Sequence, residues 1–158
     1  MRKQKIYLDT SVVSHLDQTD APDKMSDTLA LWEEIKLGFY DACISSVVVD
    51  EIMKNREPKQ SILLGYIADI ECTVLEVNET VDILARKFIE HGILKEKSID
   101  DCYHIAFAMS YGCDAIVSWN FKHIFNIKTI RGVKIVSGVT GYPEIAIYSP
   151  TILTEGDD

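Results

Sequence analysis

The chain has 158 residues, of which 47% are hydrophobic, and its formal net charge is −9. This length fits a single domain over 1–158, with a core at about 5–150 and an acidic tail at 151–158. The longest apolar runs have the length of strands, which excludes membrane-spanning helices. Because no apolar signal segment follows the basic N-terminus, we expect a cytoplasmic protein that is not bound to a membrane.

The charge is distributed unevenly along the chain. Residues 9–114 carry nine basic groups and 21 acids, whereas 115–143 carry four basic groups and no acid. A negative net charge disfavours nucleic-acid binding, because phosphate contacts require positive groups. The acid-free segment is nevertheless suited to face phosphate, and chance patterning of an exposed surface explains it equally well.

Short apolar segments alternate with amphipathic ones from the N-terminus onward. The pattern predicts strands at 6–8, 42–46, 73–77, 115–118 and, at an edge, 145–148. A helix start is predicted at 9–11, and longer helices are predicted at 26–38, 47–53, 58–68, 79–91 and 99–111, with a turn and short helix at 119–124. This alternation predicts an α/β fold, a three-layer α/β/α sandwich around a mostly parallel central sheet.

Four polar side chains are expected at the carboxyl edge of that sheet, where such folds bind ligands. Asp9 follows the first strand, Glu51 lies early in the helix after the second strand, and Asn120 follows the fourth. Asp101 lies on the core-facing stripe of its predicted helix. These residues are far apart in the sequence, and we expect them to converge.

Carboxylates that converge must share protons or bind a cation. Oxygen ligands without an accompanying Cys or His favour Mg²⁺ or Mn²⁺, so we predict such an ion on Asp9, Glu51 and Asp101. A bound metal acidifies water and stabilises negative charge on a phosphoryl group during in-line displacement. The set therefore predicts hydrolysis of phosphodiester bonds, with Asn120 assisting.

The first two acids also have structural interpretations. Asp9 is a typical N-cap for the helix that follows it, and Ser11 either orients Asp9 or donates to the backbone. Glu51 is equally typical of a solvated helix acid, with Asp50 as a substitute in the site.

The later positions have alternatives as well. Asp100 competes with Asp101 and is suited to stabilise the start of its helix. Ser118 and Asn120 are also common turn residues. The histidines show no metal-binding spacing, and each is interpreted as a surface or structural residue: His15, His91, His104 and His123.

Taken in order, several short motifs resemble PIN-domain ribonucleases, a family that includes the toxins of type II toxin-antitoxin pairs. The motifs are Asp-Thr-Ser at 9–11, Glu51 early in a helix, Asp-Cys-Tyr-His-Ile-Ala-Phe-Ala at 101–108 and Val-Ser-Trp-Asn-Phe at 117–121. The resemblance spans roughly 5–150. It implies an α/β/α sandwich with metal-dependent ribonuclease activity.

By position, the family's three acidic metal-site residues correspond to Asp9, Glu51 and Asp101. Asn120 stands where many members carry a fourth acid after a Ser or Thr, here Ser118. This departure removes one charge and weakens a second metal site.

Our leading hypothesis is a Mg²⁺- or Mn²⁺-dependent endoribonuclease, the toxin of a toxin-antitoxin pair. The resemblance implies RNA as substrate, an antitoxin protein as partner and a homodimer in which the apolar region 133–139 contributes a contact. The alternative is a catalytically weak or inactive PIN-like module that binds RNA or protein. A metal-dependent phosphatase acting on small phosphoesters is the third hypothesis.

Overall fold

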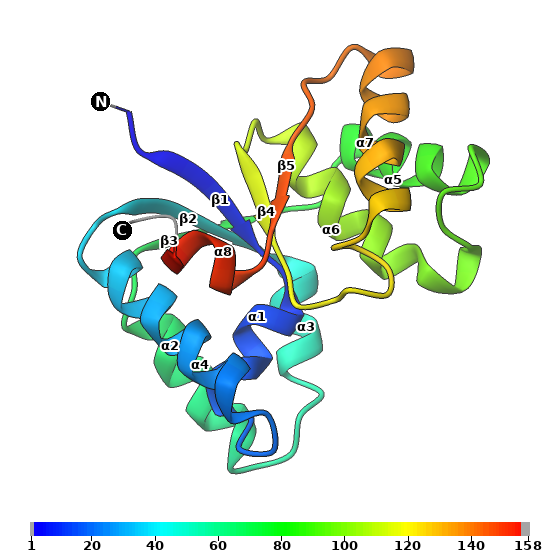
Figure 1. Cartoon of the computed structure of the whole chain (residues 1–158). Coiled ribbons are helices and arrows are strands. Elements are labelled where there is room, and N and C mark those ends of the chain that lie inside the picture. Colours follow the sequence, from blue (N-terminus) through cyan, green and yellow to red (C-terminus); the bar gives the residue numbers. More distant parts are fainter. Residues whose placement is uncertain (1, 156–158) are drawn as a thin grey trace.

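The computed structural model describes residues 2–155, in which strands and helices alternate (Figure 1). The strands are β1 (Gln4–Leu8), β2 (Tyr40–Ser45), β3 (Cys72–Leu75), β4 (Ala115–Val117) and β5 (Ala146–Tyr148). The helices are α1 (Thr10–Ser14), α2 (Pro22–Lys36), α3 (Ser46–Ile52), α4 (Lys59–Ala68), α5 (Glu79–Glu90), α6 (Ile99–Ser110), α7 (Ile127–Thr140) and α8 (Pro150–Glu155). Two short 3-10 helices lie at His15–Asp17 and Glu96–Ser98.

The five strands form one parallel sheet in the order β3-β2-β1-β4-β5. β1 is central, and its Ile6 lies between Ala42 of β2 and Ala115 of β4. The side chains of Ile6, Tyr7 and Leu8 are fully buried, as expected for a central parallel strand covered on both faces. The predicted α/β fold with a parallel central sheet is therefore confirmed.

Helices cover both faces of this sheet (Figure 1). α5, α6 and α7 lie on one side, and α2, α4 and α8 lie on the other. α6 packs against β1, β4 and α5, and its run from Ile105 to Met109 is buried all round. The predicted three-layer sandwich is confirmed, and none of its described helices has the length and apolar character needed to cross a bilayer.

The sequence analysis missed α7, a helix of 14 residues within the acid-free segment. Its β-branched residues and two internal glycines favour other structures. The helix forms because Asn126 caps its first turn by accepting the N–H of Thr129 at 2.8 Å, and Gly141 ends it with a φ of 82°. Gly132 lets α7 lie against Ile93, since a Cβ there would come within 2.6 Å of that side chain.

Three other expectations differ from the structure. α2 begins at Pro22 rather than after Ser26, because proline is preorganised for a first helical position. The short helix predicted at 119–124 is absent, and the carbonyl of Asn120 instead closes a turn. Part of the predicted tail at 151–158 forms α8, which packs on α2, while 156–158 lie outside the described residues.

Candidate active site

Asp9 lies directly after β1, at the centre of the sheet's carboxyl edge, and is only 2% exposed. Its Oδ1 accepts the N–H of Val12 at 3.1 Å, so the expected N-cap is confirmed. Burial raises the pKa of Asp9 above its usual value, although the charge of His104 and hydrogen bonds from Ser11 and Ser118 oppose the rise. Asp9 can therefore cap α1 and also lie among the polar side chains that gather at this edge of the sheet, which we call the polar cluster.

Two serines fix the Asp9 carboxylate from both sides. Ser11 Oγ donates to Oδ1 at 2.6 Å, and Ser118 Oγ donates to Oδ2. Each hydroxyl also accepts a backbone N–H, from Trp119 to Ser11 and from Asn120 to Ser118, both at 2.9 Å. Ser11 thus orients Asp9, which was one of its two expected roles, and the serines join the ends of β1 and β4.

Glu51 lies in α3, half-buried, and accepts a hydrogen bond from His104 Nε2 at 3.0 Å. Burial raises the pKa of Glu51, but the hydrogen bond and charge of His104, with a hydrogen bond from Thr10, lower it below its usual value. Asp50, the expected substitute, is exposed. Glu51 is therefore the acid of this pair that faces the polar cluster.

His104 is the residue that the sequence analysis left outside the site. It is buried in α6, one turn after Asp101, and its Nδ1 lies 2.7 Å from the hydroxyl of Tyr7. That hydroxyl lies 2.8 Å from Oγ of Ser45, the N-cap of α3. A chain of polar contacts therefore runs from Ser45 through Tyr7 and His104 to Glu51. Burial lowers the pKa of His104, but Glu51 and the other two carboxylates raise it above its usual value. In the sequence, the signal that could have identified His104 as a site residue is its position three residues after Asp101.

Asp101 lies in the first turn of α6, and its Oδ1 accepts a hydrogen bond from Asn120 Nδ2 at 3.2 Å. Asn120 Oδ1 in turn accepts the N–H of His123 at 3.0 Å. Burial raises the pKa of Asp101, the charges of His104 and His123 lower it, and the two other acids raise it further. The competing Asp100 is exposed. The structure thus pairs Asn120 with Asp101.

Each of the three carboxylates raises the pKa of His104, and Glu51 also contacts it directly. Their chemistry fits a hard cation, because Asp9 and Glu51 raise the pKa of Asp101, and neighbouring carboxylates gain from a shared positive charge. Oδ2 of Asp101 accepts no hydrogen bond from residues 2–155 and is open to such an ion. Within that range, however, no three acid, His or Cys side chains already stand as a set of metal ligands.

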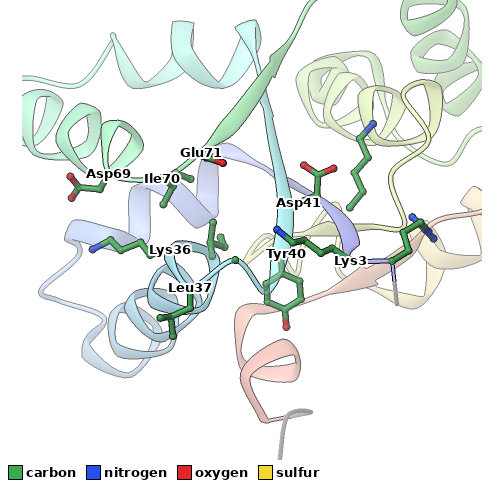
Figure 2. A pocket seen from close by; sticks show the side chains of 12 residues that line it. Lys3, Lys36, Leu37, Tyr40, Asp41, Asp69, Ile70 and Glu71 are labelled. Atoms are coloured by element: carbon green, nitrogen blue, oxygen red, sulfur yellow. The ribbon is translucent and has the colours of Figure 1, made fainter.

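A cavity of about 680 Å³ lies at the opposite edge of the sheet (Figure 2). Its lining comes from segments at or just before the starts of β1, β2 and β3 and from the end of α2, and its labelled side chains are Lys3, Lys36, Leu37, Tyr40, Asp41, Asp69, Ile70 and Glu71. Acidic and basic groups are mixed there. This cavity is not part of the candidate active site.

The model of the PIN domain family matches residues 6–122 of this chain. The fold is similar to that of VapBC2 from Rickettsia felis bound to a fragment of promoter DNA, with 14% identity, a TM-score of 0.56 and coverage of 92% of this chain and 98% of that one. It is also similar to VapC20 from Mycobacterium tuberculosis, a sarcin-ricin loop cleaving toxin, with 15% identity, a TM-score of 0.57 and coverage of 89% and 98%. No curated protein matches the sequence.

Proposed function

The chain belongs to the PIN domain family, a family of nucleases and toxins, and from this premise we propose that it is a Mg²⁺- or Mn²⁺-dependent endoribonuclease. The observation that carries the proposal is the placement of three acids at the carboxyl edge: Asp9 directly after β1, Glu51 on His104 at 3.0 Å, and Asp101 one turn before His104 on α6. A metal-dependent nuclease needs this concentration of negative charge, because carboxylates recruit the divalent ion that assists phosphodiester hydrolysis.

The three acids would hold the metal, which when bound supplies an acidified water and positive charge beside the scissile phosphate. The protein's other side chains keep the acids in place. Ser11 and Ser118 fix both oxygens of Asp9, and Asn120 holds Asp101. His104 holds Glu51 through the hydrogen bond at 3.0 Å. Such supporting hydrogen bonds typically affect activity or metal affinity by about 10- to 100-fold.

Cleavage of a single-stranded RNA with Mn²⁺, with and without a chelator, tests the proposal. Asp9→Asn keeps an oxygen for the helix cap but removes the charge, so we expect it to cut at least about 100-fold more slowly than the wild type. Asp50→Asn removes an exposed acid next to Glu51 and serves as the matched control, with unchanged cleavage. Equal rates for the wild type and Asp9→Asn would refute the proposal.

A specific observation also favours the alternative, a binding module with little catalysis. Glu51 is engaged by His104, and no preformed set of metal ligands exists among residues 2–155. This alternative predicts RNA or protein binding that survives loss of the carboxylates and no thermal stabilisation by Mg²⁺. A metal-dependent rise in Tm that vanishes in Asp101→Ala favours the nuclease instead.

We further propose that an antitoxin protein binds this chain in the cytoplasm and that two copies form a homodimer. The first part is supported by the Rickettsia felis neighbour, which is a VapBC complex. The second is supported by α7, where Ile135 is 47% and Val139 57% exposed. Sedimentation velocity tests the dimer, because Val139→Asp is expected to shift the population to monomer.

A further inference from the structure

We propose that a basic cavity beside Asp101 binds phosphates of the RNA backbone next to the bond that is cut. This inference rests on the proposed function. The cavity has a volume of about 210 Å³ and lies between the segment leading into α6 and the start of α7. Its lining residues are Ile93, Leu94, Lys95, Lys97, Ser98, Lys122, His123, Asn126, Lys128 and Thr129.

The lining concentrates positive charge without a compensating acid. It contains four lysines, all exposed, and no carboxylate. None of the four forms an ion pair with any carboxylate of the described chain, whereas Lys36 and Lys87 elsewhere do. Four like charges around one small cavity repel one another, and a bound anion would relieve that repulsion.

The cavity is joined to the acidic cluster through a short chain of contacts. His123 lines the cavity, its backbone N–H donates to Asn120 Oδ1, and Asn120 Nδ2 donates to Asp101. Ser98, on another wall, immediately precedes α6, whose first turn carries Asp101. The cavity is therefore connected to Asp101 through Asn120, and it is the Asp101 side of the acidic cluster that a phosphate held by the lysines would adjoin.

The position of the basic cavity beside the acidic cluster meets a requirement of an acidic nuclease site. The carboxylate cluster and the net charge of −9 repel the polyanionic substrate, so binding requires a positive surface beside the cluster. The cavity supplies that surface from two separate parts of the chain. Lys122 and Lys128 belong to the acid-free segment 115–143, and Lys95 and Lys97 lie before α6. An RNA backbone with one phosphate at the acidic cluster and neighbouring phosphates in this cavity would be bound at both sites.

The test measures binding separately from cleavage. Fluorescence anisotropy with a labelled 12-nucleotide single-stranded RNA is recorded in the Asp9→Asn background at several salt concentrations. We expect Lys122→Gln/Lys128→Gln to weaken binding by about tenfold and to reduce the salt slope by about 0.7 for each lysine. Lys95→Gln/Lys97→Gln, on the other wall, is expected to have the same effect.

The matched control is Arg131→Gln/Lys134→Gln, which removes two exposed charges from α7 outside the cavity lining. It should leave affinity and salt slope close to those of the parent. Equal losses in the control and cavity variants would overturn the inference, as would RNA binding that ignores the cavity lysines. Lysine-dependent binding of a polyglutamate peptide without RNA binding would also overturn it, in favour of an acidic protein partner.

Cleavage by chains that retain Asp9 separates this inference from the proposed function. If the wild type cuts RNA with Mn²⁺ but cavity variants bind as the parent does, only the cavity assignment fails. If RNA binding depends on the cavity lysines but no metal supports cutting, the cavity stands as a phosphate-binding site, whereas the nuclease and the placement beside a cut bond both fail.

Discussion

The contact between α7 and Ile93 predicts opposite effects for one substitution at two glycines of the same helix. A Cβ at Gly132 would lie 2.6 Å from Cγ2 and 2.8 Å from Cγ1 and Cδ1 of Ile93, where ordinary contact begins near 3.4 Å. Ile93 is buried and β-branched, so it has few ways to turn aside. A Cβ at Gly138 would meet no atom within 4 Å.

The magnitudes follow from two opposing effects. Replacing glycine by alanine inside a helix stabilises it by about 1 kcal/mol, and this gain applies to both sites. Overpacking against a buried side chain costs about 2 kcal/mol and applies only to Gly132. We therefore expect Gly132→Ala to lower the free energy of unfolding by about 1 kcal/mol and Gly138→Ala to raise it by about 1 kcal/mol.

Urea unfolding followed by far-UV circular dichroism, together with thermal melts, measures both variants. The difference between them isolates the contact with Ile93, because the change in helix propensity is shared. For a chain of this length it corresponds to about 4–8 °C in Tm. If Gly132→Ala proves as stable as Gly138→Ala, then α7 does not pack on Ile93 as described.

Two further predictions concern charged groups. Asn120→Asp replaces the amide that donates to Asp101 at 3.2 Å by a second carboxylate. Because the two carboxylates repel each other, the Tm without metal should fall and the rise in Tm on adding Mn²⁺ should grow, as measured by scanning fluorimetry. An unchanged metal-free Tm would contradict the pairing of Asn120 with Asp101. The hydrogen bonds from Arg2 and from the Lys5 backbone lower the pKa of Asp114, so its charge stabilises the fold above the usual carboxyl pKa and this contribution is lost as the pH falls through the lowered value. Urea unfolding should therefore show wild type and Asp114→Asn differing most near neutral pH and converging in acid, and a gap that widens in acid would refute this.

The sheet and its acidic edge were predictable because local pattern and topology agree there. Ile6 to Leu8 form an uninterrupted apolar segment that ends at a carboxylate, and a buried parallel strand requires such a segment. The carboxyl ends of neighbouring strands meet at one edge, which placed Asp9 near Asn120 without knowledge of any contact. The two roles considered for Asp9 did not compete, since one carboxylate performs the capping and lies in the cluster.

α7 and His104 were not predictable in the same way, because tertiary contacts determine both. α7 overrides the β preference of its residues through the Asn126 cap and the packing of Gly132 on Ile93. A histidine on a helix gives no local indication of its partners. His104 joins the cluster only because the fold brings Glu51 and Tyr7 to it from two other elements.

The central position of β1 determines when the site can form during synthesis. The hydroxyl that fixes the second oxygen of Asp9 belongs to Ser118, which is synthesised 109 residues later. β1 also cannot complete its pairing until β4 has emerged. A nascent chain therefore carries β1 with one edge unpaired until β4 has been synthesised, and the acidic cluster is complete only after Ser118 has been added.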